Sequence, residues 1–475
     1  MSPTALSNPS LTSTPTPEPP IVPPGSDFPV QQHTLDNGLR IWLQPDPTAI
    51  STTALLLINV GARSETSDIN GISHFLEHMV FTGTEKWDEL EIERRISRQG
   101  GHWNAWTGWE NTTYYAQTAA SDLSIALEWL SQVVFRPTLP EDKVERERKV
   151  IFQEKSGRYG WILNHLNHWG FGYNLNQKLR QVMFPDSTLG WTIIGEDQAL
   201  DNINRDKLQA YYDRHYVPGN ATLVVAGNTD LNTLKTLAQQ YFGLIPAQTV
   251  PPQPPTPVVP QPRTRPIIVR GFTTTDQVKL QLVARTVGWD HPDRWPLTVL
   301  AEILDQQLME ELRTNQGLVY GVGAWNASYR DVGYWEVSTS VSRKNKNQAL
   351  TEIEAHLERQ NITNFTETER VEAKNALIGR WALSMESSYS RASWLSNWAS
   401  NVTDITEIPN YRDRIQAVTQ ADLERVWDTY LQPQQRYLGM HLPLVTVHSA
   451  VRWGAIGLGG FLLGVLTWYG LRYWG

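Results

Sequence analysis

The chain has 475 residues, 41 Lys and Arg against 49 Asp and Glu, a formal net charge of −8, and no cysteine. This length allows two or three domains with full hydrophobic cores and excludes one small domain, while the negative charge provides no basic field for binding a nucleic acid. The absence of cysteine excludes disulfides, thiol catalysis and iron–sulfur clusters, so any metal site must use histidine and carboxylate ligands.

The first 28 residues are rich in Ser, Thr and Pro and almost free of charge. This composition is typical of a disordered tail, which we assign to residues 1–28. The segment lacks the basic start and the apolar stretch of a cleavable export signal. We therefore expect no export by this route.

Residues 29–247 mix strand and helix patterns without regular βαβ alternation. Asp36-Asn37-Gly38 indicates a tight turn before a strand at 39–43. Further patterns predict a strand at 53–60 and helices at about 71–81, 88–99, 121–134 and 140–157. Such a mixture is typical of an α+β domain.

The helix predicted at 71–81 carries the sequence His74-Phe75-Leu76-Glu77-His78. At about 100° per residue, His74, Glu77 and His78 share one helix face, so two imidazoles can bind one cation beside a carboxylate. Zinc accepts such ligands, and a carboxylate next to a zinc-bound water can accept its proton. The pattern is the inverted form of the His-Glu-x-x-His zinc motif. The alternative is an amphipathic helix with incidental polar residues.

A third ligand must come from another segment. In the helix predicted at 140–157, Glu147 and Glu154 are seven residues apart and share a face with apolar side chains. A carboxylate on an apolar face is costly unless it meets a cation or a donor. A metal could meet Glu154, and a histidine N–H could meet Glu147. The alternative is that both are solvated charges on a highly charged helix.

The proline-rich segment 248–266 predicts an extended linker. It separates residues 29–247 from a second domain at 267–446. Five positions near the end of the first domain recur at a constant offset in the second: Ile203, Leu208, Tyr212, Tyr216 and Pro218 correspond to Val418, Leu423, Trp427, Leu431 and Pro433. Each set predicts an amphipathic helix followed by a strand, so a duplicated α+β unit is the economical interpretation, with chance similarity as the alternative.

The C-terminal segment 453–471 contains no charged residue and has Trp and Tyr near both edges. About 20 apolar residues span a bilayer core, and aromatic rings favour its interfaces. The pattern predicts a transmembrane anchor over 451–471, with a buried terminal helix as the alternative. We therefore expect a single-pass membrane protein whose body faces the cytoplasm.

The sequence resembles the pitrilysin/insulinase family of zinc metallopeptidases, in its processing-peptidase-like branch, over about residues 30–445. The resemblance rests on the inverted motif within Gly71–Thr84 and on four further segments: Leu35–Arg40, Gly61–Glu65, Glu147–Glu154 and Tyr216–Asn220. It implies two homologous α+β domains that form half of a clam-shaped peptidase.

The resemblance also implies roles for individual residues. It makes His74, His78 and Glu154 the ligands of one Zn²⁺ per chain. It makes Glu77 the general base and Glu147 a second functional carboxylate.

The same resemblance implies residues that bind substrate. Arg313 and Tyr320 of the second domain would reach a zinc site and hold the substrate backbone. Asn104 and Ala105 would belong to a strand that pairs with an extended peptide. Three tryptophans near this strand depart from the usual family residues, and we expect them to line a hydrophobic subsite: Trp103, Trp106 and Trp109.

These observations predict a zinc-dependent metalloendopeptidase that cleaves peptides or unfolded protein segments. Because one chain supplies half of the family's chamber, we expect a homodimer or a heterodimer with a paralogue, and no nucleic-acid partner. The alternatives are a non-catalytic membrane-bound scaffold or assembly subunit of the same fold, and a catalytic subunit that depends on a paralogue. The complete ligand set, base and Arg/Tyr pair favour the enzyme.

Overall fold

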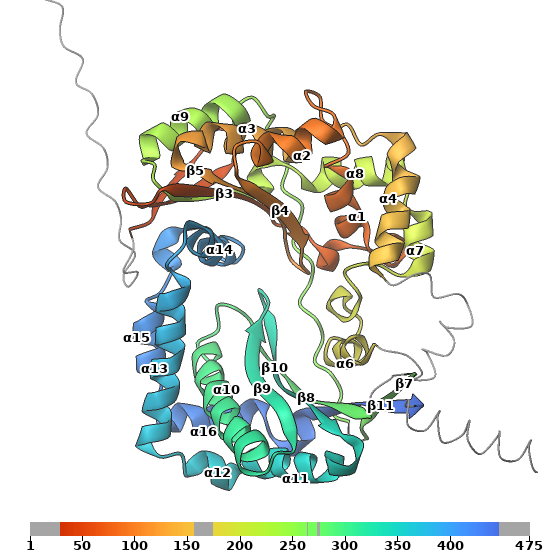
Figure 1. The fold of residues 1–475 in the computed structure, drawn as a ribbon, viewed down its shortest axis with the longest axis vertical. Helices are drawn as coiled ribbons and strands as arrows, with labels where there is room; N and C mark the ends of the chain where they lie inside the picture. Colours follow the sequence, from red (N-terminus) through yellow and green to blue (C-terminus); the bar gives the residue numbers. More distant parts are fainter. Residues whose placement is uncertain (1–28, 156–173, 264, 273–275, 446–475) are drawn as a thin grey trace, which may run out of the picture.

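The computed structural model describes residues 29–155, 174–263, 265–272 and 276–445 (Figure 1). They form two α+β domains, each with one sheet covered by helices, as predicted. The predicted tail at 1–28 lies outside the described residues. The proline-rich segment contains neither helix nor strand over 248–263.

The N-terminal domain contains a six-stranded sheet in the order β1-β2-β6-β3-β5-β4. Its strands are β1 (Gln31–Thr34), β2 (Arg40–Pro45), β3 (Ser51–Ile58), β4 (His102–Thr107), β5 (Thr112–Ala119) and β6 (Ala221–Gly227). Its helices are α1 (Ile72–Met79), α2 (Glu89–Ser97), α3 (Leu123–Phe135), α4 (Glu141–Glu154), α6 (Leu175–Met183), α7 (Asp197–Asn202), α8 (Arg205–His215) and α9 (Leu231–Phe242).

The C-terminal domain contains a five-stranded sheet in the order β7-β11-β8-β10-β9. Its strands are β7 (Ile267–Phe272), β8 (Gln277–Val287), β9 (Val319–Ser328), β10 (Val332–Ser342) and β11 (Arg436–Val445). Its helices are α10 (Arg294–Leu308), a π-helix (Met309–Asn315), α11 (Lys346–His356), α12 (Arg359–Thr363), α13 (Glu367–Ser384), α14 (Ser388–Ala399), α15 (Tyr411–Gln416) and α16 (Gln420–Tyr430).

The two sheets share one pairing pattern. In the N-terminal sheet, β2 and β6 are parallel and the following pairs β6–β3, β3–β5 and β5–β4 are antiparallel. In the C-terminal sheet, β7 and β11 are parallel and the pairs β11–β8, β8–β10 and β10–β9 are antiparallel. The N-terminal sheet adds only β1. This match supports the predicted duplication, and it makes β4 and β9 equivalent edge strands.

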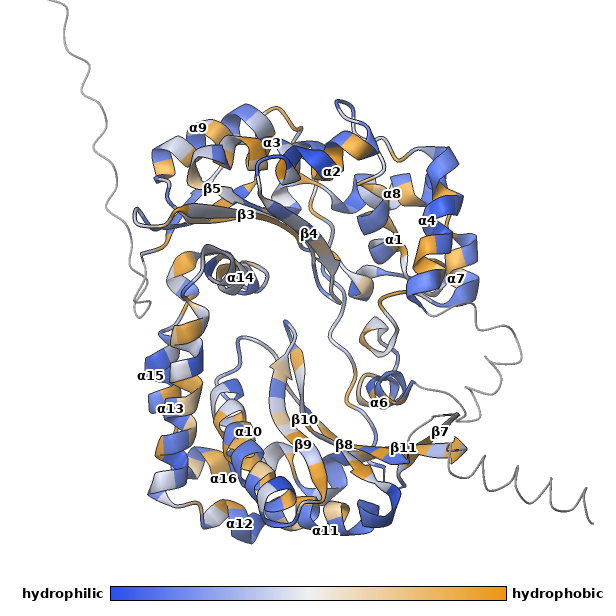
Figure 2. Cartoon of the chain, in the orientation of Figure 1, coloured by the Kyte–Doolittle hydropathy of each residue, from blue (hydrophilic) through white to orange (hydrophobic). Residues whose placement is uncertain are grey.

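Hydrophobic side chains fill the layers between sheets and helices. One cluster joins the N-terminal sheet to α1, α3 and α9, whereas α14 packs on the other face of that sheet, against β3 and β6. In return, α6 packs against β7 and β11 of the C-terminal sheet. Figure 2 shows that many helices carry hydrophilic and hydrophobic residues on different sides, as packing on a sheet requires. Each domain thus covers part of the other's sheet.

The predicted membrane anchor is not supported. A helix that crosses a bilayer needs about 20 apolar residues. Among the described residues, no helix is long and apolar enough to do so. The predicted transmembrane helix, and the single-pass membrane location deduced from it, are therefore corrected. Segment 451–471 itself lies outside the described residues.

Candidate metal centre

Helix α1 presents His74, Glu77 and His78 on its less buried side. Its apolar positions Ile72, Phe75, Leu76 and Met79 are buried in the N-terminal core, which fixes how the helix faces its neighbours. The two imidazoles are one turn apart, with ring centroids separated by 4.7 Å. Because the apolar residues of α1 face the core, its histidines and Glu77 lie on the side that packs near β4 and α4.

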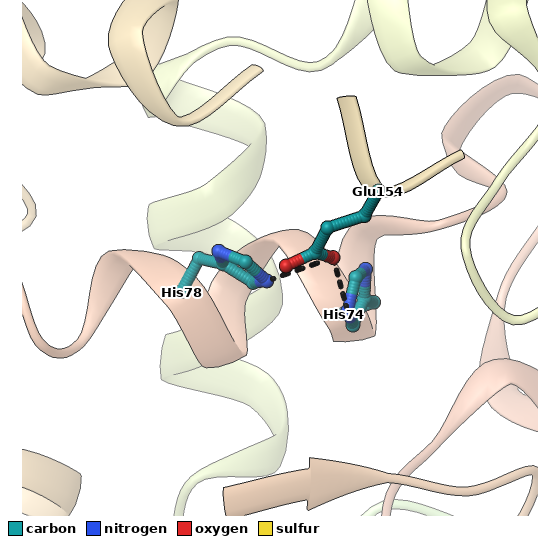
Figure 3. Close-up of side chains that lie close together, drawn as sticks. All are labelled: His74, His78 and Glu154. Carbon is teal, nitrogen blue, oxygen red and sulfur yellow. Dashed lines mark ion pairs between the residues drawn. The ribbon is translucent and has the colours of Figure 1, made fainter. Parts of the chain in front are cut away.

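Glu154, the last residue of α4, completes a group of three potential ligands (Figure 3). Its Oε2 atom lies 3.6 Å from Nε2 of His74 and 3.6 Å from Nε2 of His78. One ligand atom from each residue lies within 4.8 Å of the others. Tetrahedral zinc with bonds of 2.0–2.1 Å separates its ligand atoms by roughly 3.3 Å. The three side chains therefore fit a zinc ion after small adjustments.

The protonation of the two histidines differs with their surroundings. Burial, and the proximity of His78, lower the pKa of His74 to about 4, so its imidazole is neutral and able to bind a metal. Burial also lowers the pKa of His78, but the hydrogen bond with Glu147 and the nearby carboxylates outweigh it and raise the net pKa. A cation between these carboxylates is therefore favoured, whether it is a proton or a metal.

Glu147 lies next to Nδ1 of His78, whereas Glu154 lies next to Nε2 of the same ring. Glu147 is buried, its Oε2 is 3.5 Å from Nδ1 of His78, and its Oε1 accepts a 2.8 Å hydrogen bond from Nε of Arg146. Burial raises the pKa of Glu147, but the bonds from His78 and Arg146 prevail and lower it. Glu147 can thus orient the imidazole of His78, as second carboxylates around metals commonly do.

Glu77 lies beside this group and faces β4. Its Oε2 accepts a 2.5 Å hydrogen bond from Oγ1 of Thr107. Burial raises the pKa of Glu77, and the bond from Thr107 and the proximity of His78 offset part of that rise. A carboxylate of raised pKa is a better proton acceptor near neutral pH. Thr107 was not singled out from the sequence, although it closely follows Asn104 and Ala105 on the same strand.

The predicted substrate strand is β4, at the edge of its sheet. Asn104 is exposed, and its Oδ1 accepts a 2.9 Å hydrogen bond from the backbone N–H of Ala105. An edge strand offers unpaired backbone groups to an added strand. The geometry is compatible with peptide binding at Asn104 and Ala105.

The three tryptophans do not form one subsite. Trp103 is partly buried and packs against the N-terminal core, with its ring centroid 5.0 Å from that of Phe81. The ring centroid of Trp109 lies 3.6 Å from Cζ of the Arg180 guanidinium. Trp106 packs instead against the hydrophobic cluster that includes the C-terminal domain. The expected shared hydrophobic subsite is therefore wrong.

Arg313 and Tyr320 lie together in the C-terminal domain. Arg313 is in the π-helix, and its guanidinium lies 5.2 Å from the ring of Tyr320, which is 86% exposed at the start of β9. Among the described residues, no hydrogen bond or ion pair joins either to His74, His78 or Glu154. Isolated π-turns often mark functional positions. Tyr320 is thus open to solvent, with the Arg313 guanidinium next to its ring.

Glu65 anchors the start of α1 and was not singled out from the sequence, although it ends the Gly61–Glu65 segment. Its buried carboxylate accepts hydrogen bonds from the backbone N–H groups of Gly71 (2.8 Å) and Ser73 (3.0 Å) and from Nδ2 of Asn70 (2.8 Å). These bonds satisfy N–H groups that a helix start leaves free. Glu65 therefore fixes the position of the helix that carries the motif.

Glu65 should make stability depend on pH. Burial raises its pKa from the usual 4.5 to about 7, although its three hydrogen-bond donors lower it in part. The folded protein then binds the proton more tightly than the unfolded chain, so the free energy of unfolding should fall as pH rises between these values, by about 1–3 kcal/mol. Urea unfolding of the wild type and Glu65→Gln across this pH range measures the effect. Equal pH slopes in both proteins would contradict it.

Comparison with known proteins gives two matching family models. Residues 40–158 match the model described as Insulinase (Peptidase family M16), and residues 202–377 match Peptidase M16 inactive domain. The mitochondrial-processing peptidase subunit beta of Mus musculus is 30% identical over 413 residues, covering 84% of this chain and 81% of that protein. The uncharacterized zinc protease YmxG of Bacillus subtilis is 28% identical over 368 residues, covering 77% and 86%.

Solved structures share the fold. A protease from Helicobacter pylori aligns with a TM-score of 0.77 at 22% identity, covering 88% of this chain and all of that one. Pitrilysin aligns with a TM-score of 0.72 at 20% identity, covering 90% of this chain but 46% of its own length. The chain therefore corresponds in length to the first structure and to about half of the second.

Proposed function

Because the chain belongs to the insulinase family of peptidases, family M16, we propose that it is a zinc-dependent endopeptidase that hydrolyses peptides or unfolded protein segments. The observation that carries this proposal is the convergence of His74, His78 and Glu154, with Glu77 beside them. Relatives named zinc proteases support both the metal and the peptidase activity.

The chain's own residues suit each part of peptide hydrolysis. When bound by His74, His78 and Glu154, zinc supplies a Lewis acid that polarises a carbonyl and makes water more acidic. Glu77 would accept the proton of the attacking water and deliver it to the leaving amine. Glu147 would hold the Nδ1–H of His78, so that Nε2 faces the metal.

Substrate would lie along β4 as a strand added to the edge of the sheet. Backbone groups of Asn104 and Ala105 would hold it with little regard for its side chains. This mode suits extended or unfolded chains, because a folded segment cannot offer its backbone to a sheet edge.

We place Arg313 and Tyr320 at the zinc site of a partner subunit. Tyr320 is exposed beside Arg313, and both are on the domain that lacks the metal residues. A guanidinium and a phenol can donate hydrogen bonds to the developing oxyanion. One relative is itself named as a subunit, which supports assembly. The partner would be a second copy or a paralogue.

The match to an inactive domain does not favour a non-catalytic scaffold. It covers residues 202–377, whereas His74, Glu77, His78 and Glu154 lie in the segment that matches the insulinase model. The proposed metal site therefore falls outside the inactive domain.

Digestion of a peptide library with and without a chelator tests the proposal. We expect cleavage by the purified chain, loss of cleavage on metal removal, and recovery on adding about one equivalent of zinc per chain. Mass spectrometry of the products and metal analysis of the protein are the measurements. Cleavage that resists the chelator, or a purified active protein without zinc, would contradict it.

A further inference from the structure

Thr107, the last residue of β4, contacts the proposed general base Glu77. Its Oγ1 lies 2.5 Å from Oε2 of Glu77. An ionised carboxylate only accepts hydrogen bonds, so the hydroxyl is the donor. Among the described residues, this is the only hydrogen bond that the Glu77 carboxylate accepts, and Oε1 is left without a donor from them.

One hydrogen bond can decide where this carboxylate points. The terminal torsion of a glutamate is broad, so an unbound carboxylate samples many orientations. Threonine is branched at Cβ, which restricts its χ1, and here it stands on a strand paired with β5 at Thr112. A hydroxyl held in this way engages one oxygen of Glu77 and leaves the other for a water molecule.

The end of β4 is itself held in place by the segment Gly61–Glu65. The carbonyl of Gly108 accepts a 3.1 Å hydrogen bond from the N–H of Ala62, and the carbonyl of Trp109 accepts one of 2.7 Å from the N–H of Arg63. A Cβ at residue 61 would lie 2.4 Å from the carbonyl oxygen of Gly108, so only glycine allows this approach. The backbone next to Thr107 is therefore fixed.

The same segment holds the helix that carries Glu77. Glu65 binds the N–H groups of Gly71 and Ser73 at the start of α1. Arg63, buried between these attachments, forms ion pairs with Glu110 and with Asp331 of the C-terminal domain. One short stretch of chain thus ties the strand end to the helix start. The separation of Thr107 from Glu77 follows from the fold rather than from a flexible loop.

We propose that Thr107 is a positioning residue that orients the carboxylate of the general base Glu77, with Gly61–Glu65 setting their distance. This inference rests on the proposed peptidase function. Thr107 is assigned no contact with metal or substrate, and it acts only through Glu77.

Thr107→Val and Thr107→Ser test this role. Valine keeps the shape of threonine and removes the donor, whereas serine keeps the donor. We expect Thr107→Val to lower kcat by about 10- to 100-fold with KM nearly unchanged, because a small misplacement of a catalytic group can cost about that much. Thr107→Ser should retain most of the activity. Thr118→Val is the matched control, since the buried Thr118 hydroxyl of β5 has no hydrogen-bond partner among the described residues.

Crystal structures of the wild type and both Thr107 variants give a readout independent of activity. We expect one Glu77 carboxylate orientation in the wild type and Thr107→Ser, and several or a different one in Thr107→Val, at unchanged melting temperature and zinc content. An unchanged Glu77 orientation, or wild-type kcat in Thr107→Val, would overturn the proposal while leaving the peptidase assignment intact. If the wild type cleaves no peptide, the peptidase assignment fails, and the crystallographic comparison still decides whether Thr107 orients Glu77.

Discussion

Replacing Glu77 with Gln should abolish peptide cleavage while the protein stays folded and keeps its zinc. The amide has nearly the shape of the carboxylate, and its oxygen can still accept the hydrogen bond from Thr107. It cannot accept a proton from water. We therefore expect kcat to fall by about 10²- to 10⁴-fold, the range typical for loss of a general base.

The measurements are the turnover of a cleaved library peptide, bound zinc by mass spectrometry, and the melting temperature. Glu93→Gln is the matched control, because this exposed glutamate of α2 lies outside the site. Wild-type turnover in Glu77→Gln would exclude Glu77 as the base. Loss of zinc together with activity would show instead that Glu77 helps to hold the metal.

Helical periodicity was enough to place the motif. The spacing of His74, Glu77 and His78 predicts one helix face, and α1 presents that face because its apolar residues are buried on the other side. The two sheets also share one order of strand pairing, which supports the duplicated α+β unit predicted from the repeated helix and strand pattern. Local sequence patterns were sufficient to predict both features, because the motif lies within one helix and each copy of the repeated pattern lies within one domain.

The third ligand could not be chosen from spacing. Glu147 and Glu154 are two turns apart on one side of α4, so the sequence shows that both can face α1 but not which one meets the metal. The choice came from the family resemblance. In the structure, Glu154 lies near both imidazoles and Glu147 lies behind His78, because α4 packs across α1 in one orientation. That packing angle is a tertiary property.

Contacts between distant segments were the least predictable. Thr107 and Glu65 reach α1 through the arrangement of the sheet and of the segment Gly61–Glu65, and neither leaves a periodic signal. For the tryptophans, in contrast, the sequence did contain a signal, and it argues against the expected subsite. Side chains alternate along a strand, so Trp103 and Trp106 face opposite sides of β4 and cannot share a subsite.

The proposed role of Arg313 at the zinc site of a partner subunit can be tested by substitution. We expect Arg313→Ala to lower kcat by about 10²- to 10³-fold, the usual cost of losing a donor to an oxyanion. If Arg313 serves the zinc site of the other copy in a homodimer, each Arg313→Ala protein lacks the arginine at both sites. Each Glu77→Gln protein lacks the base at both sites. Neither variant alone should therefore cleave peptides efficiently.

Mixing the two purified variants should restore activity. In a mixed dimer, the subunit that carries Arg313→Ala keeps its own Glu77 and receives Arg313 of the partner subunit, which completes one site. Random exchange of subunits makes half of the dimers mixed, so about a quarter of all sites should be intact. Recovery to about that fraction of wild-type turnover, with a dimer seen by light scattering, supports sites shared between subunits. A mixture no more active than the mean of its components would place Arg313 at the zinc site of its own chain, or in no site. Mixing Glu93→Gln with Glu77→Gln controls for losses during mixing, because it should give about half of the wild-type activity with or without exchange and in either arrangement. Native mass spectrometry of the Arg313→Ala and Glu77→Gln mixture verifies that mixed dimers form.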